Sequence, residues 1–194
     1  MSLKEKIIHE SLKLFSLKGF LNTSIDDILK AANSSKGGFY NHFKSKEDLF
    51  FHVLDEARRI WRDRNLAGIG QNGDPISNVK QLLENFRDRY LKDAENFPGG
   101  CVFITLLVEL DNQRPHLANE INKGFIGLKN IIKRNLDRGK ELGKLRKDSN
   151  TEAITEMLFN GMLGATITYN AEKSSAALDK SIYFMIDYIK QLEA

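Results

Sequence analysis

Cysteine, proline and long apolar runs are scarce in this sequence of 194 residues. The one cysteine, Cys101, excludes a disulfide within the chain. Each of the three prolines (Pro75, Pro98 and Pro115) stands where a helix could begin. No apolar run approaches the roughly 20 residues of a membrane-spanning helix, and the N-terminus enters a charged helical pattern without the apolar segment of a signal peptide. We therefore expect a cytoplasmic protein with no membrane partner.

Metal-binding and catalytic patterns are also missing. The four histidines form no pair at a spacing of four, so a zinc site would lack its usual ligands. No paired catalytic carboxylates, nucleophile–base set or phosphate-binding loop is present. We expect no metal, no cofactor and no enzymatic activity.

Alternating strand patterns are nearly absent, whereas apolar residues recur at spacings of three and four throughout. This periodicity predicts an all-α protein. The predicted helices cover 3–18, 25–32, 34–43, 45–65, 76–96, 101–112, 115–143, 151–171 and 175–192.

Helix boundaries are marked by residues that cap helices. Gly19 is expected to end the first helix, and Thr23 or Ser24 to cap the second. Asn33 suits the left-handed turn after the second helix. Ser34 or Ser35 would cap the third helix. Ser45 would cap the fourth, with Asp48 three residues later in an arrangement like a capping box.

The segment 66–75 has three glycines and a proline, which makes it the best connection between helical blocks. We expect an N-terminal three-helix domain over 1–48 and a second helical domain over 49–194. The helix 49–65 would connect the two domains.

Positive charge is concentrated near the N-terminus. Residues 1–64 hold 12 basic and 9 acidic residues, whereas residues 65–194 hold equal numbers of each, so the first third carries the whole net charge of +3. This small excess indicates a polyanionic partner. The basic run 129–147 has 8 basic and 2 acidic residues, and a solvated helix face explains it better than a DNA site does.

The segment 34–49 combines small residues, hydroxyls, aromatics and lysines. Small residues let a DNA backbone approach, hydroxyls and amides meet phosphates, and lysines neutralise them. With the capped helix before it, the segment forms a helix-turn-helix pattern, whose second helix enters the major groove. Phe39 and Phe43 would hold this helix to the core.

The residues 23–28 and 35–49 resemble the DNA-binding domain of the tetracycline-repressor (TetR) family. The resemblance covers roughly residues 5–54 and includes the pattern Tyr-x-His-Phe-x-x-Lys-x-x-Leu. One difference is the turn, which in the family usually reads Ala-Gly-Val-Ser and here reads Ala-Asn-Ser-Ser over 32–35. Carried over by position, the resemblance implies DNA contacts from Thr23, Ser24, Ser34, Ser35, Lys36, Gly37, Gly38, Tyr40, Asn41, His42 and Lys46.

The resemblance further implies a homodimer on a pseudo-palindromic double-stranded DNA operator and a small-molecule inducer bound in the second domain. Aromatic and apolar residues with a few polar tips suit an apolar ligand, although core packing is the favoured alternative for each residue. The candidate lining is Trp61, Phe86, Tyr90, Cys101, Phe103, Leu107, Phe125, Phe159, Met162 and Tyr169. The candidate dimer surface, for which packing within one chain is the alternative, is Gly161, Gly164, Ile182, Met185, Ile186 and Ile189.

Cys101 follows a glycine at the start of a predicted helix, where a thiol can become a reactive thiolate. It is either a sensor of oxidants or electrophiles, as in some relatives, or a small buried apolar residue, which we favour. The sequence as a whole predicts a transcriptional repressor released by a small apolar or reactive molecule. The alternative is a helical carrier or enzyme with a vestigial DNA-binding head.

Overall fold

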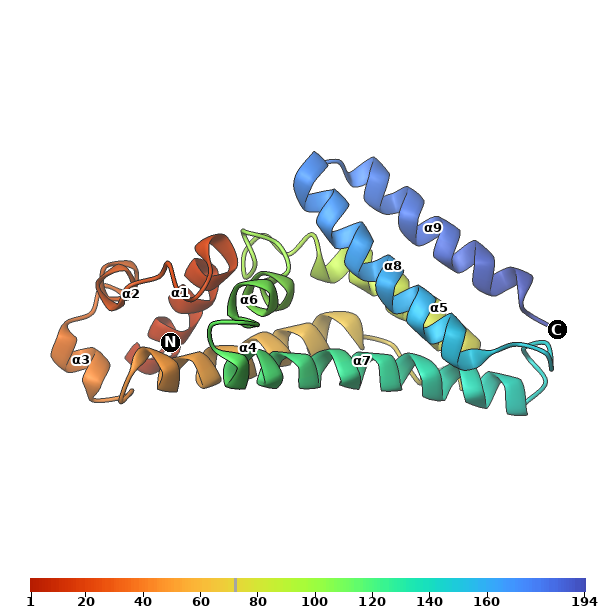
Figure 1. The fold of residues 1–194 in the computed structure, drawn as a ribbon, viewed down its shortest axis with the longest axis horizontal. Coiled ribbons are helices and arrows are strands. Elements are labelled where there is room, and N and C mark those ends of the chain that lie inside the picture. The colour runs from red at the N-terminus through yellow and green to blue at the C-terminus, as the bar shows by residue number, and fades with distance from the viewer. Residues whose placement is uncertain (72) are drawn as a thin grey trace. The chain divides into compact units, whose positions relative to one another are not determined.

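The computed structural model describes residues 1–71 and 73–194, and helices dominate this part of the chain. The predicted all-α fold is confirmed. Figure 1 shows the helices in order. They are α1 (Leu3–Lys18), α2 (Ile25–Ala32), α3 (Lys36–Tyr40), α4 (Lys46–Asn65), α5 (Pro75–Asn85), the π-helical turn η1 (Phe86–Tyr90), α6 (Val102–Leu110), α7 (Pro115–Glu141), α8 (Thr151–Glu172) and α9 (Ser175–Gln191).

The chain divides into two compact units. The first unit comprises Met1–Trp61 and Asp93–Asn122, and the second comprises Arg62–Lys92 and Lys123–Ala194. The first unit therefore contains α6 and the start of α7 as well as the N-terminal helices. The domain boundary after residue 48 stays a prediction.

Aromatic side chains hold the first unit together. Phe20 lies edge-on to Phe15 and to Phe50, with ring centroids 5.5 and 5.4 Å away. All three rings are buried. Phe20 follows α1 and Phe50 lies on α4, so this cluster joins the end of α1 to the fourth helix. α1 also packs against α2 and α6 (Figure 1).

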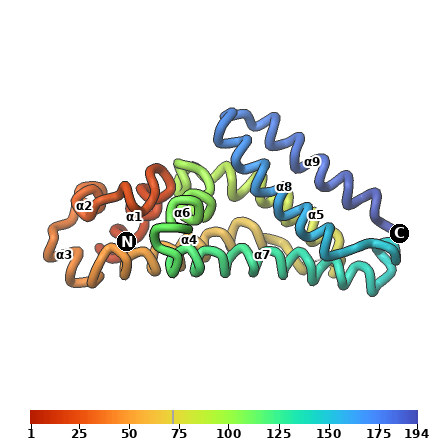
Figure 2. The backbone as a smooth tube through the Cα atoms, in the orientation of Figure 1, coloured from red at the N-terminus to blue at the C-terminus, as the bar shows by residue number. Residues whose placement is uncertain are grey.

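The second unit is built on the pairing of α8 with α9, which run side by side as a helical hairpin (Figure 2). Ile182 and Ile189 on α9 and Leu158 on α8 are fully buried. α5 and η1 also contact α9. The side chain of Ile76 on α5 occupies the space beside Gly139 that a β-carbon would take, so α7 lies close to α5 there.

Most helix boundaries agree with the sequence, and two differ. The helix predicted over 76–96 is α-helical only as far as Asn85, and a π-helical turn continues it to Tyr90. The third helix ends at Tyr40 rather than 43. Pro75 and Pro115 begin α5 and α7, whereas Pro98 precedes α6 by several residues.

The predicted connection 66–75 includes Asn72, which lies outside the described residues. Around it, Asn85 donates hydrogen bonds of 2.9 Å to the carbonyls of Asn65 and Ala67. The Gly70 amide donates to Asn78 Oδ1 at 2.9 Å. The described part of this segment is therefore tied to α5 by side-chain amides.

The basic run 129–147 is paired with acidic groups. Lys129 meets Glu156 at 2.9 Å, Lys133 meets Asp137 at 2.8 Å, and Lys144 meets Asp74 at 3.4 Å. This pairing supports a solvated helix face over a DNA site. No helix in the described part of the chain is long and apolar enough to span a membrane.

Candidate nucleic-acid interface

The helices α2 and α3 are each capped at the N-terminus by a serine that the sequence offers for this role. Ser24 Oγ accepts the Asp27 amide at 3.0 Å while the Asp27 carboxylate accepts the Ser24 amide at 2.9 Å, which completes a capping box. Asn33 adopts the left-handed conformation, with φ 48° and ψ 53°. Ser35 caps α3 by accepting the Gly38 amide at 3.1 Å. These contacts fix the angle between the two helices of a helix-turn-helix.

The inner side of this motif is apolar. Phe39 is fully buried and Phe43 is 1% exposed, with ring centroids 5.5 Å apart. Ile28 and Ala32 of α2 are fully buried as well. Burial of Phe39 on this helix of five residues, and of Phe43 shortly after it, holds α3 in place, because so short a helix is not stable alone.

The outer side of α3 and the turn after it is polar and solvent-exposed. Its exposed members are Ser35, Lys36, Gly37, Tyr40, Asn41 and His42. Tyr40 is 54% exposed, and its ring lies edge-on to Phe39 at 5.2 Å, so the core orients an aromatic side chain that projects outward. Six of the predicted DNA-contacting residues thus share one surface.

The two glycines of α3 have different surroundings. A β-carbon at Gly37 would meet nothing closer than Ser35 Oγ at 3.9 Å, so this position is open to a partner. A β-carbon at Gly38 would lie 2.8 Å from Ser34 Oγ and 3.2 Å from Leu3 Cδ2. Gly38 therefore lets α3 pack closely within the protein, and only Gly37 is free for close approach by DNA.

Charges on this surface are partly balanced. Lys36 lies 3.9 Å from Asp26, and both side chains are mostly exposed. Lys18 donates to Asp27 at 2.9 Å, and this hydrogen bond, with those from Ser24, holds the pKa of Asp27 well below its usual range. Lys30 and Lys44 are exposed and form no ion pair among the described residues. They are further cations that the sequence analysis did not single out.

Two residues predicted to contact DNA form hydrogen bonds within the protein. Thr23 is fully buried, and its hydroxyl donates to the Gly19 carbonyl at 2.6 Å, so Ser24 is the cap of α2 and Thr23 has no surface to offer a phosphate. Lys46 Nζ donates to the carbonyls of Phe20 and Thr23 at 2.8 Å each. Burial lowers the pKa of Lys46. Lys46 therefore anchors the loop after α1, and its phosphate contact stays a prediction.

Glu109, which no motif indicated, also holds that loop. Its carboxylate accepts the amides of Phe20 at 2.7 Å and Leu21 at 3.0 Å. A sequence separation of 88 and 89 residues leaves no local pattern by which this contact could have been predicted.

Comparison with known proteins agrees with this geometry. Residues 7–53 match the family model "Bacterial regulatory proteins, tetR family", and residues 75–185 match "Tetracyclin repressor-like, C-terminal domain". The second match alone covers more than half of the chain. The chain belongs to the TetR family. It is accordingly a DNA-binding, ligand-responsive transcriptional regulator, and the alternative of a carrier or enzyme is not favoured.

Individual relatives support the assignment over most of the chain. An HTH-type transcriptional regulator of Lactococcus lactis is 31% identical over 134 residues, which is 69% of this chain and 67% of the relative. The transcriptional repressor DhaR of Mycobacterium sp. strain GP1 is 24% identical over 91% of this chain and 87% of its own. A TetR regulator from Chloroflexus aurantiacus has the same fold, with a TM-score of 0.90 at 24% identity over 98% of this chain and 96% of its own.

The predicted ligand-pocket residues are divided between the two units of the regulator. Trp61, Cys101, Phe103 and Leu107 belong to the first unit, and the other six belong to the second. In the second unit Phe125 lies edge-on to Phe159 at 5.6 Å, and Phe159 and Met162 are buried. A common pocket for all ten residues stays a prediction.

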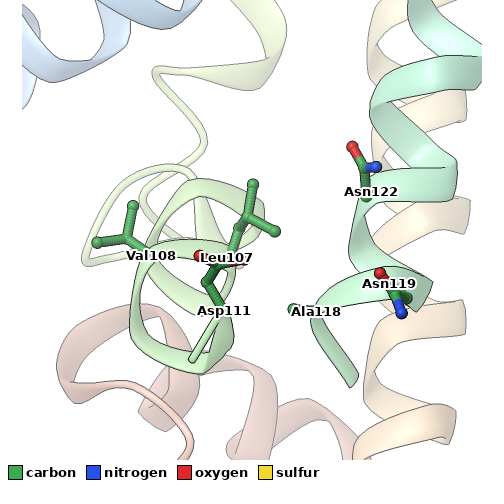
Figure 3. Close-up of a pocket in the computed structure, with 6 residues that line it drawn as sticks. All are labelled: Leu107, Val108, Asp111, Ala118, Asn119 and Asn122. Carbon is green, nitrogen blue, oxygen red and sulfur yellow. The ribbon is translucent and has the colours of Figure 1, made fainter. Parts of the chain in front are cut away.

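The structure has a surface pocket of about 480 Å³ within the first unit, between α6 and the start of α7 (Figure 3). Its lining is Leu107, Val108, Asp111, Ala118, Asn119 and Asn122. Leu107 is the one residue that it shares with the predicted pocket. Cys101 lies at the start of α6 and is 6% exposed, the burial of a small apolar residue.

The predicted dimer surface is largely used within the second unit. Ile182 and Ile189 are fully buried, Met185 is 7% exposed, and a β-carbon at Gly161 would lie 2.7 Å from Met185 Sδ. Met185 packs against Gly161 of α8 in the same chain, and Ile182 and Ile189 are part of the core of the second unit. Gly164 is exposed and Ile186 half-buried, so these two are available to a second subunit.

Proposed function

We propose that this regulator is a homodimeric repressor that reads a pseudo-palindromic operator with α3 and releases it when a small molecule binds. The observation that carries the proposal is the polar face of α3, where Lys36, Gly37, Tyr40 and His42 are exposed over a helix fixed by buried Phe39. A helix of this kind can enter the major groove while the hydroxyls and lysines around it meet phosphates.

The short side chains of α3 limit direct base recognition. Two of its five residues are glycines, and Gly37 faces outward without a side chain. We therefore infer that base contacts come from Tyr40, Asn41 and His42, and that DNA shape and backbone contacts contribute part of the specificity.

Dimerisation is supported by an exposed apolar surface on α8 and α9. Tyr183 is 60% exposed, Phe184 57% and Tyr188 40% on α9, and Ile167 of α8 is 57% exposed. Large apolar side chains gathered on one surface indicate a protein–protein contact. We propose this surface, with Gly164 and Ile186, as the dimer interface. A symmetric dimer would place two helix-turn-helix motifs on one operator.

Repression and release by a small molecule rest on two supports. DhaR, which matches over most of this chain, is a transcriptional repressor by name. The buried aromatic residues of the second unit, including Phe86, Tyr90 and Phe159, could form part of an apolar site if a ligand separates them. We propose an apolar or weakly polar inducer and a cytoplasmic location, where the protein would meet both DNA and inducer.

The proposal is tested by selecting duplexes from a random-sequence pool with the purified wild-type protein. We expect recovery of an inverted repeat, bound by an even number of subunits, with an affinity that falls steeply as salt rises. The variant Tyr40→Phe, which keeps the ring on Phe39, should weaken this operator without altering the melting temperature. Recovery of no common sequence at low salt would contradict the proposal.

The inducer is sought by native mass spectrometry of the purified protein, followed by extraction of any bound molecule. We expect a molecule that raises the melting temperature and lowers operator affinity when it is added back. A bound molecule that stabilises the protein and leaves operator affinity unchanged would contradict its role as the inducer.

A further inference from the structure

Glu109 occupies a position on α6 that is unfavourable by itself. It lies in the last turn of the helix, where the partial negative charge of the helix end repels a carboxylate. Instead of facing solvent, the carboxylate accepts the backbone amides of Phe20 and Leu21, at 2.7 and 3.0 Å. These amides lie in the loop after the C-terminus of α1, and Glu109 is their acceptor.

Gly19 makes room for this carboxylate. A β-carbon at position 19 would lie 2.4 Å from the nearest Glu109 oxygen, and Gly19 has a φ of 80°, which favours glycine. The loop therefore has both the backbone conformation and the open space that the contact requires. The fit on both sides distinguishes it from a chance surface contact.

Lys46 holds the same loop through its carbonyl groups. Its ammonium donates to Phe20 and Thr23, at 2.8 Å each, and lies 4.3 Å from the centre of the Phe20 ring. The charge of Glu109 partly opposes the effect of burial on the pKa of Lys46. A carboxylate from α6 and an ammonium from α4 thus bind the amides and carbonyls of one short segment, 20–23.

This segment leads directly into α2. Thr23 closes it by donating to the Gly19 carbonyl, and the next residue, Ser24, is the cap of α2. The direction of α2 sets the direction of α3, because the two helices are joined by a turn of three residues. Any shift of the loop would therefore move the surface that meets DNA.

We propose that Glu109 is a positioning residue for operator recognition: with Lys46, it fixes the loop 19–23 and thereby the orientation of α2 and α3. The role rests on the DNA binding described above, but Glu109 itself lies on the sixth helix and does not touch DNA. Glu109 binds the backbone of the loop, so it affects the orientation of the helix-turn-helix and not the attraction of the protein for phosphates.

The test compares Glu109→Gln with Asp111→Asn. Both variants remove one negative charge at the same end of α6, but Asp111 is exposed and forms no ion pair among the described residues. We expect Glu109→Gln to weaken binding to the selected operator about tenfold, or about 1.4 kcal/mol, and to leave binding to a random duplex unchanged or tighter. Asp111→Asn should keep operator affinity within about twofold, since it alters charge without releasing the loop.

Hydrogen exchange without DNA gives an independent readout. In Glu109→Gln the amides of Phe20 and Leu21 should exchange at least about tenfold faster, while those of α1 and α4 stay at the wild-type rate. The double variant Glu109→Gln/Lys46→Met should lose less operator affinity than the two single losses together, because both residues hold one loop.

Three outcomes would overturn the proposal: equal operator affinities for Glu109→Gln and Asp111→Asn, faster exchange throughout the first unit, or unchanged exchange at Phe20 and Leu21. Failure of the wild-type protein itself to select an operator would instead count against the proposed repressor function. The exchange result does not depend on that selection, so the two failures can be told apart.

Discussion

Gly99 lies directly against the carbonyl of Ser16, so closely that a β-carbon at position 99 would be 1.9 Å from that oxygen. The Gly99 amide also donates to Ser16 Oγ at 2.8 Å. The segment before α6 therefore meets the last turn of α1 through backbone on both sides. Together with the Glu109 contact, this gives α6 an attachment to α1 at each of its ends.

Replacing Gly99 by alanine should destabilise the first unit. The clash is with backbone, which cannot rotate away, so we expect a loss of about 1–3 kcal/mol in the free energy of unfolding, the usual cost of overpacking. Urea unfolding followed by circular dichroism measures the loss. Gly127→Ala is the matched control, because a β-carbon there meets nothing within 4 Å in the interior of α7. This control should be neutral or stabilise the protein by up to about 1 kcal/mol. Equal stability of the two variants would refute the close approach at Gly99.

The helix-turn-helix could be predicted because its determinants are local. Ser24, Asn33 and Ser35 act on amides or turns within three residues, and the burial of Phe39 follows from helical spacing. The contacts of Gly99 and Glu109 span more than 80 residues, so no periodicity or cap reveals them. The carbonyl contacts of Lys46 could not be predicted either, because a lysine in a DNA-binding motif looks the same in the sequence whether it meets a phosphate or two carbonyls.

The dimer surface shows a second limit of sequence patterns. The spacing of Ile182, Met185 and Ile189 correctly predicts an apolar face, and all three residues are buried. The spacing does not indicate which helix packs against that face. Here the stripe of these three residues is buried within the same chain, where Met185 lies against Gly161 of α8. The neighbouring aromatic residues Tyr183 and Phe184 remain exposed, and only the structure separates the two sets.

Lys36 and Lys46 should respond differently to removal of their charge. Lys36 is exposed and faces the proposed DNA surface, so Lys36→Met should lower the salt dependence of operator binding by about one counterion and leave stability unchanged. Lys46→Met removes two hydrogen bonds to carbonyls and should lower the free energy of unfolding by about 1–3 kcal/mol, with little change in salt dependence. Fluorescence anisotropy between 50 and about 200 mM salt, with thermal melts, measures both. A reduced salt slope for Lys46→Met at wild-type stability would support its predicted phosphate contact.

Because of Asp27, the stability of the helix-turn-helix should fall as pH is lowered in the acid range. Its pKa is lowered from an ordinary value of 3.8, first by the hydrogen bond from Lys18 and then by those from Ser24. Because the pKa of Asp27 is lower in the folded protein, the ionised carboxylate stabilises the fold fully at pH values above its ordinary pKa. This stabilisation begins to be lost as pH falls below about 4, and it vanishes below the folded-state pKa. Wild type should therefore melt higher than Asp27→Asn at pH 6, and the difference should shrink at pH 3. A constant difference between these pH values would show that the carboxylate charge is not responsible.

Phe184 should be needed for dimerisation and not for folding. Its ring is 57% exposed on α9 and lies edge-on to Tyr183 at 5.7 Å, so Phe184→Asp removes apolar surface without opening a cavity in the chain. In a two-fold interface the substitution occurs twice. A loss of about 1.5–3 kcal/mol of binding free energy per ring should therefore weaken the affinity of the two subunits by about a hundredfold or more. Sedimentation equilibrium measures this, and the melting temperature of the diluted monomer should stay unchanged.

Ile182→Ala provides the contrast for the dimer test. Ile182 of α9 is fully buried within the second unit, so its truncation should cost about 2–5 kcal/mol of unfolding free energy, while any folded protein still dimerises. The two substitutions therefore separate the surface between subunits from the core within one. If Ile182→Ala gave a stable monomer and Phe184→Asp a normal dimer, the interface would lie on the stripe predicted from the sequence, and α8 and α9 would have to exchange partners between chains.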